Sequence, residues 1–450
     1  MEAKENKMGV MPVKKLIVNM SLPMMASMLV QALYNIVDSI YVSQISEGAL
    51  TAVTLAFPLQ NLMIAFASGV GVGVNALLSK SLGEKNYDRA DRAANAGLTL
   101  TLVNYVIFVL LGLFAVSPFI ASQSGIEEIR RSGEVYLRIV TTLSAGLFFQ
   151  VMFERLLQST GLTFYSMISQ MTGAVINIIF DPIMIFGLLG FPKLGVAGAA
   201  YATVLGQSVA AVLGLILNMK KNKEIHLSVP LVLAPGLWVV GRIYRVGVPS
   251  ILMMAIGSVM TYMMNLILGS FTATAQAVFG VYFKLQSFFF MPVFGLNSGL
   301  IPVLAYNYGA RNRKRIEEAL AFALKLAVGI MILGTIVFEC VPSLLLRMFD
   351  ASPDMMAMGV TALRIIALHF PLAGASIALG SVFQAFSKSM YSLVISVSRQ
   401  LVVLIPAAWL LAQTGSVQNV WFAFPIAEVV SLLLSLFFFR RLYNGIVKKL

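Results

Sequence analysis

The sequence predicts an all-α integral membrane protein with twelve transmembrane helices in two six-helix bundles. Of its 450 residues, 59% are hydrophobic and only 11% are charged, which excludes a soluble globular protein and a disordered one. Apolar runs of about 20 residues, the length that crosses a bilayer, recur along the whole chain. The sequence also repeats itself at an offset of 226 residues. These three observations carry the prediction.

The apolar runs and the basic residues together define the expected topology. We expect helices at about 16–45, 50–80, 91–121, 131–158, 161–189, 194–219, 238–269, 273–306, 316–347, 355–384, 388–412 and 418–442. Lysine and arginine gather in alternate loops, which by the positive-inside rule places both termini in the cytoplasm and the chain in the inner (plasma) membrane. The net charge of +13 therefore reflects topology, and we expect no nucleic-acid partner.

The repeat is densest at glycines and in one basic loop. Gly69 and Gly73 recur as Gly295 and Gly299, and the loop that begins at Gly83 recurs at Gly309. Six helices per repeat is an even number, so the two bundles are expected to be related by a pseudo-two-fold axis along the membrane normal. The predicted domains are an N-terminal bundle at 1–222, a cytoplasmic linker at 223–236 and a C-terminal bundle at 237–450.

Two aspartates lie inside runs that otherwise read as lipid-soluble helix. Asp181 follows Asn177 by one turn and precedes Pro182, and Asp38 lies in the first run. An ionisable residue within the membrane is by default a hypothesis for a functional site. With the expected helix ends near residues 46 and 190, both acids lie about 12–13 Å below the outer ends of parallel helices. We therefore expect Asp38 and Asp181 to share one site.

The chemistry expected of this pair is the binding of a coupling cation. Burial and a second nearby acid both favour the protonated carboxyl, so the pair could load and release a proton. Gln31, Tyr34 and Asn35 lie on the helical face of Asp38 and are expected to support it. A sodium ion held by the same oxygens and a purely structural hydrogen-bonded aspartate remain open at this point.

The second repeat has no acid at the positions equivalent to Asp38 and Asp181. Asp38 corresponds to Met264 and Asp181 to Ala407, so the coupling chemistry is expected in the first half alone. Arg399 and Glu428 fall at similar depth and are expected to form a structural ion pair. One cysteine and two histidines are too few for a metal centre, so we expect no resident cofactor, no metal site and no enzymatic activity.

Three segments of the sequence are distinctive as motifs: Ser-Leu-Pro-Met-Met at 21–25, Asn-Ile-Ile-Phe-Asp-Pro-Ile-Met-Ile-Phe-Gly at 177–187, and Ile-Pro-Val-Leu-Ala-Tyr-Asn-Tyr-Gly at 301–309. In these motifs, and over its whole length, the chain resembles the multidrug and toxic-compound extrusion (MATE) transporters, in particular the bacterial multidrug-efflux branch. This resemblance implies a V-shaped pair of six-helix bundles. It also implies export of drug-like, often cationic compounds by alternating access, in exchange for H⁺ or Na⁺.

The resemblance also implies roles for individual residues. Asp38 and Asp181 resemble the acids that bind the coupling cation, and the residues implied in their polar network are Gln31, Tyr136, Asn177 and Thr203. Pro23 resembles a first-helix proline at which the helix bends, and Pro182 is expected to bend the fifth helix. The seventh and tenth helices carry Met253, Met254 and His369 where sodium-coupled members carry acids. This difference from the sodium-coupled members favours H⁺ as the coupling ion.

The residues that contact substrate are less sharply defined by the sequence. Aromatic and methionine side chains suit a cavity for varied apolar cations, but they suit a lipid-facing surface equally. The candidate cavity residues are Phe148, Phe149, Met152, Phe153, Lys284, Phe288 and Met291. The partners expected are small organic cations and the lipid bilayer, and the chain is expected to act as a monomer.

Three other classes of protein share some of these features. A flippase for lipid-linked saccharides would use a cationic cavity, which Lys284, Arg364 and Arg399 favour and the two aspartates oppose. A major-facilitator carrier fits less well because Tyr87 holds the position of its loop aspartate. An intramembrane aspartyl protease would also use paired aspartates, but its Gly-x-Gly-Asp context does not occur in this sequence.

Overall fold

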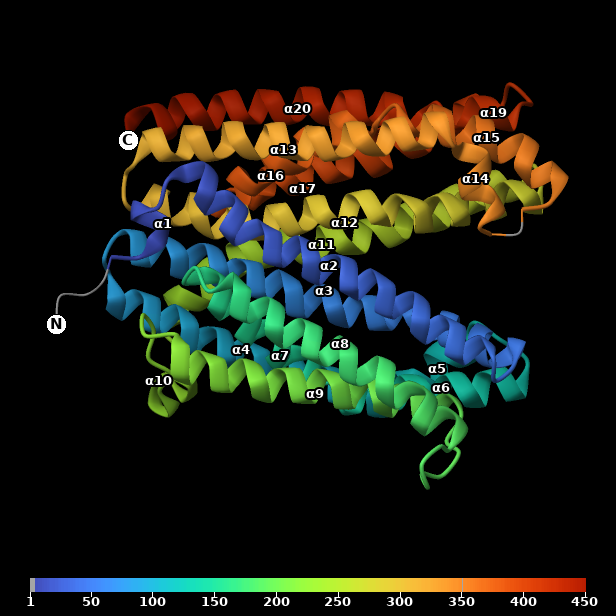
Figure 1. The fold of residues 1–450 in the computed structure, drawn as a ribbon, viewed down its shortest axis with the longest axis horizontal. Helices are drawn as coiled ribbons and strands as arrows, with labels where there is room; N and C mark the ends of the chain where they lie inside the picture. The colour runs from blue at the N-terminus through green and yellow to red at the C-terminus, as the bar shows by residue number, and fades with distance from the viewer. Residues whose placement is uncertain (1–4, 350) are drawn as a thin grey trace. The chain divides into compact units, whose positions relative to one another are not determined.

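The computed structural model describes residues 5–349 and 351–450, and all regular secondary structure in them is helical (Figure 1). Two compact units make up the fold. Unit 1 contains Ala26–Ile251 together with the residues up to Lys7, and unit 2 contains Met8–Met25 and Leu252–Leu450. The first helices are α1 (Lys7–Val10), α2 (Val13–Ser43), α3 (Glu47–Gly83), α4 (Tyr87–Phe114), α5 (Val116–Ala121), α6 (Glu127–Thr142), α7 (Ala145–Ser159), α8 (Thr163–Phe186), α9 (Val196–Lys221) and α10 (Val229–Leu233).

The remaining helices follow the same order along the chain. They are α11 (Leu237–Gly269), α12 (Ala273–Gly309), α13 (Arg313–Cys340), α14 (Pro342–Arg347), α15 (Pro353–Ala367), α16 (Phe370–Ala385), α17 (Ser389–Val397), the π-helix η1 (Ser398–Leu404), α18 (Ile405–Ala412), α19 (Val417–Val420), α20 (Ala423–Gly445) and the short 3₁₀-helix η2 (Val447–Lys449).

The predicted twelve membrane spans are present, and two of them are broken. Ten helices in the described residues are long and apolar enough to cross a membrane, and two bent pairs bring the number to twelve. The helix expected at 131–158 consists of α6 and α7, which meet at 46°, and the helix expected at 355–384 consists of α15 and α16, which meet at 44°. Pro371 in the first turn of α16 cannot continue the ladder of α15, which explains the second break.

The repeat is visible in the helix boundaries themselves. Helices α3 and α12 have 37 residues each, and the bounds of α3, α4 and α5 recur at an offset of 226 in α12, α13 and α14. In the basic loop, Asn86 and Asn312 cap the following helices by accepting from backbone N–H groups at 3.0 and 3.3 Å. Lys85 and Arg311 adopt left-handed φ values of 55° and 54°. The structure therefore confirms the repeat, including the residues that cap the repeated helices.

Two long helices contribute residues to both units, at equivalent points of the repeat. Helix α2 passes from unit 2 to unit 1 after Met25, and α11 passes from unit 1 to unit 2 after Ile251. Glycines that recur in the repeat allow each part of these helices to pack closely against its own unit. In unit 1 a Cβ at Gly69 would lie 2.9 Å from the Gly247 carbonyl oxygen, and in unit 2 a Cβ at Gly295 would lie 2.6 Å from the Met25 Cα. Only glycine permits helices to approach this closely. The compact units thus differ from the two sequence repeats in these short segments.

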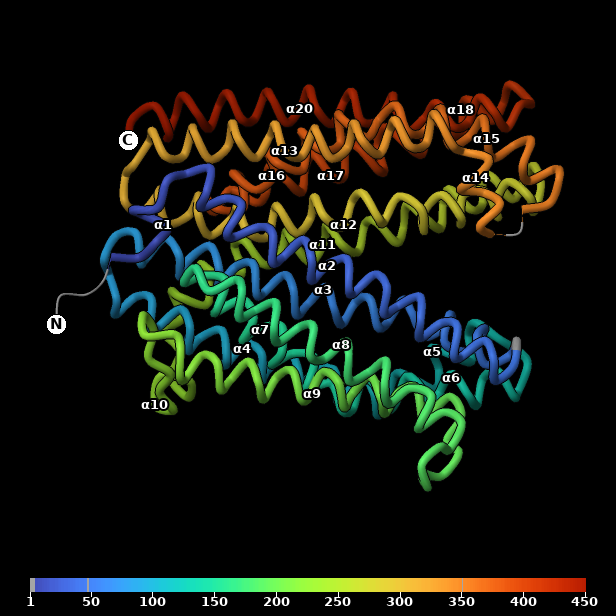
Figure 2. The backbone as a smooth tube through the Cα atoms, viewed as in Figure 1, coloured from blue at the N-terminus to red at the C-terminus, as the bar shows by residue number. Residues whose placement is uncertain are grey.

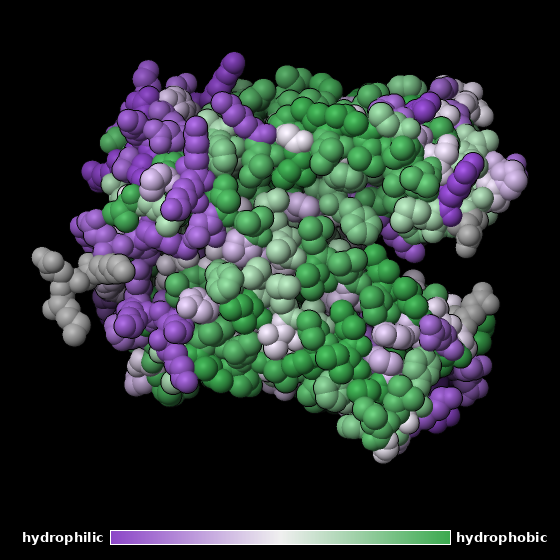
Figure 3. Space-filling model, viewed as in Figure 1, coloured by the Kyte–Doolittle hydropathy of each residue, from purple (hydrophilic) through white to green (hydrophobic). Residues whose placement is uncertain are grey.

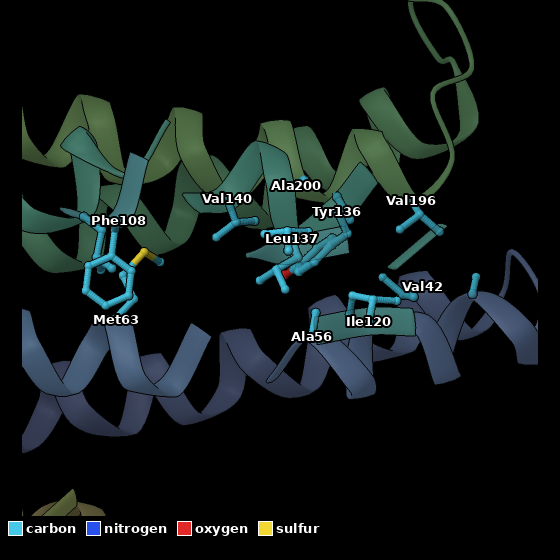
Figure 4. Close-up of a cluster of buried hydrophobic side chains, with 14 of the residues drawn as sticks. Val42, Ala56, Met63, Phe108, Ile120, Tyr136, Leu137, Val140, Val196 and Ala200 are labelled. Atoms are coloured by element: carbon cyan, nitrogen blue, oxygen red, sulfur yellow. The ribbon is translucent and has the colours of Figure 1, made fainter. Parts of the chain in front are cut away.

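The interior of unit 1 includes a cluster of apolar side chains from α3, α4, α6 and α7, shown in Figure 4. Phe108 of α4 packs on Phe148 of α7 with ring centroids 5.5 Å apart, and Met63 and Val140 lie in the same cluster. Each unit is apolar along the middle of its helices on the face seen in Figure 3, while hydrophilic side chains gather at the helix ends. This surface suits a lipid environment, where apolar side chains are not excluded from the exterior.

The loop between α8 and α9, residues 187–195, is the longest excursion from the helices of unit 1 (Figure 2). Gly187 ends α8 with a left-handed φ of 73°, and its N–H donates to the Ile183 carbonyl. Helix α8 therefore ends at Phe186, a few residues before the end that the sequence predicts, because glycine offers a C-terminal cap there.

Candidate functional site

Asp38 of α2 and Asp181 of α8 meet within unit 1. Their carboxyl groups are close enough to share a hydrogen bond. Asp181 is fully buried, and Asp38 is half-buried. Each acid lies five residues before the last residue of its helix, Ser43 in α2 and Phe186 in α8. Both helices end earlier than the sequence predicts, but by similar amounts, so the two acids remain at the same depth.

The Asp181 carboxylate is linked to α9 through Asn177. In the amide orientation that satisfies both polar atoms, Asn177 Nδ2 donates to Asp181 Oδ2 at 3.1 Å and Asn177 Oδ1 accepts from the Thr203 hydroxyl at 3.2 Å. The helices are close here because Gly173 and Gly206 face each other. A Cβ at Gly206 would lie 2.5 Å from the Gly173 carbonyl oxygen. The glycine crossing therefore positions Thr203 against Asn177.

Two tyrosines approach the carboxyl pair. Tyr34 on α2 and Tyr136 on α6 interact electrostatically with both acids, and the Tyr136 hydroxyl is hydrogen-bonded to the side chain of Gln60 on α3. Tyr136 is 2% exposed, and Figure 4 shows it beside Leu137 in the interior of the unit. Gln60 was not among the residues expected at the site. Its sequence signals are that it is polar within an apolar run and that it recurs in the repeat as Gln286.

Other expected members of the network lie elsewhere. The Gln31 Oε1 accepts from Gln170 Nε2 at 2.9 Å, so Gln31 pairs with a second amide on α8 rather than with an acid. Asn35 is exposed, and its side chain makes no hydrogen bond to either acid among the described residues. Helices α2 and α8 continue through Pro23 and Pro182 without interruption. Bending at these prolines therefore stays a prediction.

The arrangement can hold a cation, such as a proton shared between the two carboxyl groups. A hydrogen bond between two carboxyl groups requires that one of them carries a proton. Asp38 Oδ1 is buried and has no hydrogen-bond partner within the described residues, so it is available as an acceptor. A group of three or more His, Cys, Asp or Glu side chains with metal-binding geometry does not occur in the part of the chain that the structure describes.

Unit 2 has a different polar arrangement. Arg399 Nη1 donates to Glu428 Oε2 at 3.2 Å, with the Arg399 side chain 31% exposed and that of Glu428 3% exposed. Arg399 lies in the π-helix, which a sequence pattern does not reveal. His369 is buried at the break between α15 and α16, where its Nδ1 lies 2.5 Å from the Ile366 carbonyl oxygen. The role of the ion pair stays a prediction.

The candidate cavity residues fall into two groups. Phe148, Met152 and Phe153 are packed in the interior of unit 1, where their burial gives no support to a cavity role, and Phe149 is half-buried. In unit 2, one face of α12 is exposed or half-buried and presents Lys284, Phe288 and Met291. These last three residues, spaced by four and three positions, form a continuous stripe on their helix.

Comparison with known proteins gives consistent results. The MatE family model matches residues 23–183 and 249–410, one match in each repeat. The chain is 27% identical to the multidrug export protein MepA of Staphylococcus haemolyticus over 96% of this chain and 94% of that one. It is 26% identical to an FAD transporter of Shewanella oneidensis over 93% and 92% of the two chains.

Solved structures agree over the full length. The chain is similar to a multidrug resistance MATE family transporter of the MOP superfamily in an outward-facing conformation, with a TM-score of 0.94, 26% identity and 100% of both chains covered. It is equally similar to a MATE protein in complex with MaL6, with a TM-score of 0.93, 26% identity and the same coverage.

Proposed function

Because this chain belongs to the MatE family of multidrug efflux transporters, we propose that it is a proton-coupled antiporter that exports drug-like, often cationic and amphipathic compounds. It works as a monomer in the cell membrane, with both termini in the cytoplasm. The charge of the alternate loops supports this orientation.

The single observation that carries the proposal is the contact between the carboxyl groups of Asp38 and Asp181. Two carboxylates in contact repel each other strongly in a medium of low dielectric, so binding one proton relieves a large cost. Asn177 stabilises the charged form of Asp181 by donating to it, which allows the proton to leave again. A group that both binds and releases a proton is what coupling requires.

Helix α2 is suited to convert protonation into movement. Its first part belongs to unit 2 and its second part, with Asp38, belongs to unit 1. A proton shared with Asp181 holds the second part of α2 against α8, whereas two charged carboxylates push it away. The proton thus changes the position of a helix that both units share, as alternating access requires.

A second candidate is export of an anionic aromatic compound, which the exposed stripe of Lys284, Phe288 and Met291 favours. One relative is named an FAD transporter, and FAD combines aromatic rings with phosphates. A cationic substrate has no partner in a lysine, so the sign of the substrate's charge decides between the two candidates. A sodium-driven exporter and a lipid-linked saccharide flippase differ from both candidates in the gradient or the substrate that they use.

The test is transport in proteoliposomes that hold the purified protein. We expect efflux of a fluorescent organic cation under an imposed proton gradient, and loss of this efflux in Asp38→Asn and Asp181→Asn. Asparagine keeps the size of the side chain, so both variants should fold normally. Efflux driven by a sodium gradient instead would refute proton coupling. Transport of FAD but of no cation would establish the anionic candidate, and no transport of either compound would favour a flippase.

A further inference from the structure

A file of polar side chains extends from the carboxyl pair toward the opposite end of unit 1. It lies on three helices whose members repeat at intervals of one or two turns, so that each set shares one helical face. The members are Gln31, Tyr34 and Asp38 on α2, then Ser166, Gln170, Asn177 and Asp181 on α8, and Gln150, Glu154 and Gln158 on α7.

Hydrogen bonds connect the three helices along this file. Gln170 Nε2 on α8 donates to Gln31 Oε1 on α2 at 2.9 Å. Gln158 Nε2 on α7 donates to the Ser166 hydroxyl on α8, also at 2.9 Å. Tyr34 continues the file one turn beyond Gln31 and interacts electrostatically with both acids. These bonded pairs lie at successive levels between the carboxyl pair and the opposite end of the unit.

Glu154 is the acid at the far end of the file. It is 7% exposed, and its Oε1 accepts from Gln150 Nε2 at 2.9 Å. It lies five residues before Ser159, the end of α7. The neighbouring carbonyl of Phe153 accepts from Asn218 Nδ2 at 3.0 Å, near the end of α9 that carries its lysines. Glu154 is thus close to the basic end of the unit, whereas Asp38 and Asp181 are near the other end.

The charge on Glu154 is not neutralised by an ion pair among the described residues. Arg155 is the charged group that interacts with it, but the guanidinium Nη1 donates to Gln158 Oε1 at 2.9 Å instead. The helices packed on α7 are α3, α4, α8 and α9, and none of their described titratable groups forms an ion pair with Glu154. A buried carboxylate without an ion pair is costly, which favours its taking up a proton.

Three buried acceptor atoms along the file have no donor among the described residues. They are Asp38 Oδ1, Gln170 Oε1 and Gln150 Oε1, one on each of the three helices. Buried acceptors without donors are uncommon in folded proteins. Water is the donor that suits a buried polar row of this kind, and a row of water and side-chain hydrogen bonds conducts protons.

We propose that Glu154 is a second proton-carrying residue, which accepts the proton that the Asp38–Asp181 pair releases and delivers it to solvent at the basic end of unit 1. The inference rests on the proposed proton coupling. The transferred proton leaves one aspartic acid as a carboxylate and converts the Glu154 carboxylate to the neutral acid. Glu154 then gives the proton to water. No other bond forms or breaks. The route along α8 from Asp181 to Ser166 is about 22 Å long.

The experiment compares two rates in proteoliposomes for Glu154→Gln, which keeps the size of the side chain. We expect proton-driven efflux of a fluorescent organic cation to slow by roughly tenfold or more, because glutamine cannot carry the proton. Exchange of labelled for unlabelled substrate at equal pH needs no proton release and should stay at the wild-type rate. Formate added on the side that receives the proton should restore efflux, since it is a small diffusible proton carrier.

The control is Glu134→Gln on α6, which removes a half-buried acid bonded to Ser117 and lying outside the file. It should leave both rates unchanged. Normal proton-driven efflux in Glu154→Gln would overturn the relay while leaving the antiporter intact. Slowing of both rates without rescue by formate would assign Glu154 a structural role. Absence of proton-driven efflux in the wild type would instead refute the proposed function itself.

Discussion

Removal of Arg399 provides the sharpest test of the ion pair in unit 2. The Arg399→Ala substitution leaves the carboxylate of Glu428 buried without its partner, with Glu428 Oε1 already lacking a donor among the described residues. At the observed separation of 3.2 Å, an effective dielectric constant near 20 gives an attraction of about 5 kcal/mol. The Arg399 side chain is 31% exposed, so solvent screening reduces the expected loss of stability to roughly 2–4 kcal/mol.

The second arm of the test removes both charges. The variant with Arg399→Met and Glu428→Gln no longer buries an unpaired charge, so it should regain most of the lost stability and differ from wild type by about 1 kcal/mol. Thermal unfolding of the purified protein in detergent, followed by intrinsic fluorescence, reports the order of the variants. Together with the single variants Arg399→Met and Glu428→Gln, this double variant completes a double-mutant cycle that gives the interaction energy.

Two results would refute this reasoning. An Arg399→Ala protein as stable as wild type would show that the contact contributes nothing to the fold. A stable variant that no longer transports would assign the pair to the transport cycle instead of to structure. The expected result is the opposite combination, with lower stability and yield but normal transport per folded molecule, because both members of the ion pair belong to unit 2 and both aspartates belong to unit 1.

The helix caps and the glycine crossing provide two further tests. Asn86→Ala removes the acceptor for the Arg89 N–H and should lower the free energy of unfolding by about 1 kcal/mol; thermal unfolding should show a similar loss for Asn312→Ala, and a large difference between the two would contradict their equivalence. Gly206→Ala places a Cβ 2.5 Å from the Gly173 carbonyl and should separate Thr203 from Asn177, so proton-driven efflux should fall more than substrate exchange. Gly329→Ala, whose Cβ would meet no atom within 4 Å, is the control, and equal losses in both glycine variants would contradict the prediction.

The fold could be predicted from the sequence because the helix length that crosses a bilayer and the internal repeat constrain it strongly. The pairing of Asp38 with Asp181 was accessible as well, since topology and depth can be derived from apolar runs and basic loops. The breaks within the two bent spans, α6–α7 and α15–α16, were harder to predict from the sequence. Pro371 marks one of them, but the break after Thr142 has no proline, and Ser144 simply donates to the Thr141 carbonyl there.

Uncharged polar residues of the site were the least predictable part. Gln60 and Gln170 are amides in long apolar helices, and the sequence does not say whether such a side chain faces a partner or the exterior. Glu154 was not among the candidate residues that the sequence predicts. Its partner in the structure is Gln150, and Arg155 turns to Gln158. Only the packing of three helices reveals the file to which these residues belong.

The repeat explains why the two units carry different chemistry on the same scaffold. Arg399 occupies the position equivalent to Gly173, and Glu428 the position equivalent to Ala202. In unit 1 the glycine allows α8 and α9 to approach, and this closeness creates the Asn177–Thr203 contact that supports Asp181. In unit 2 an arginine at that position requires space between the helices.

The consequences in unit 2 are an ion pair and a local π-helix. Arg399 reaches Glu428 on the neighbouring helix α20, and its own helix takes the π form over Ser398–Leu404. The positions equivalent to Asn177 and Asp181 are Val403 and Ala407, so this crossing lacks the polar residues that support Asp181 in unit 1. The residue at this repeated position therefore differs together with the polar contact beside it, which is Asn177–Thr203 in unit 1 and Arg399–Glu428 in unit 2. If the acid pair binds a proton as proposed, the close glycine crossing of unit 1 is the part of the scaffold that supports it.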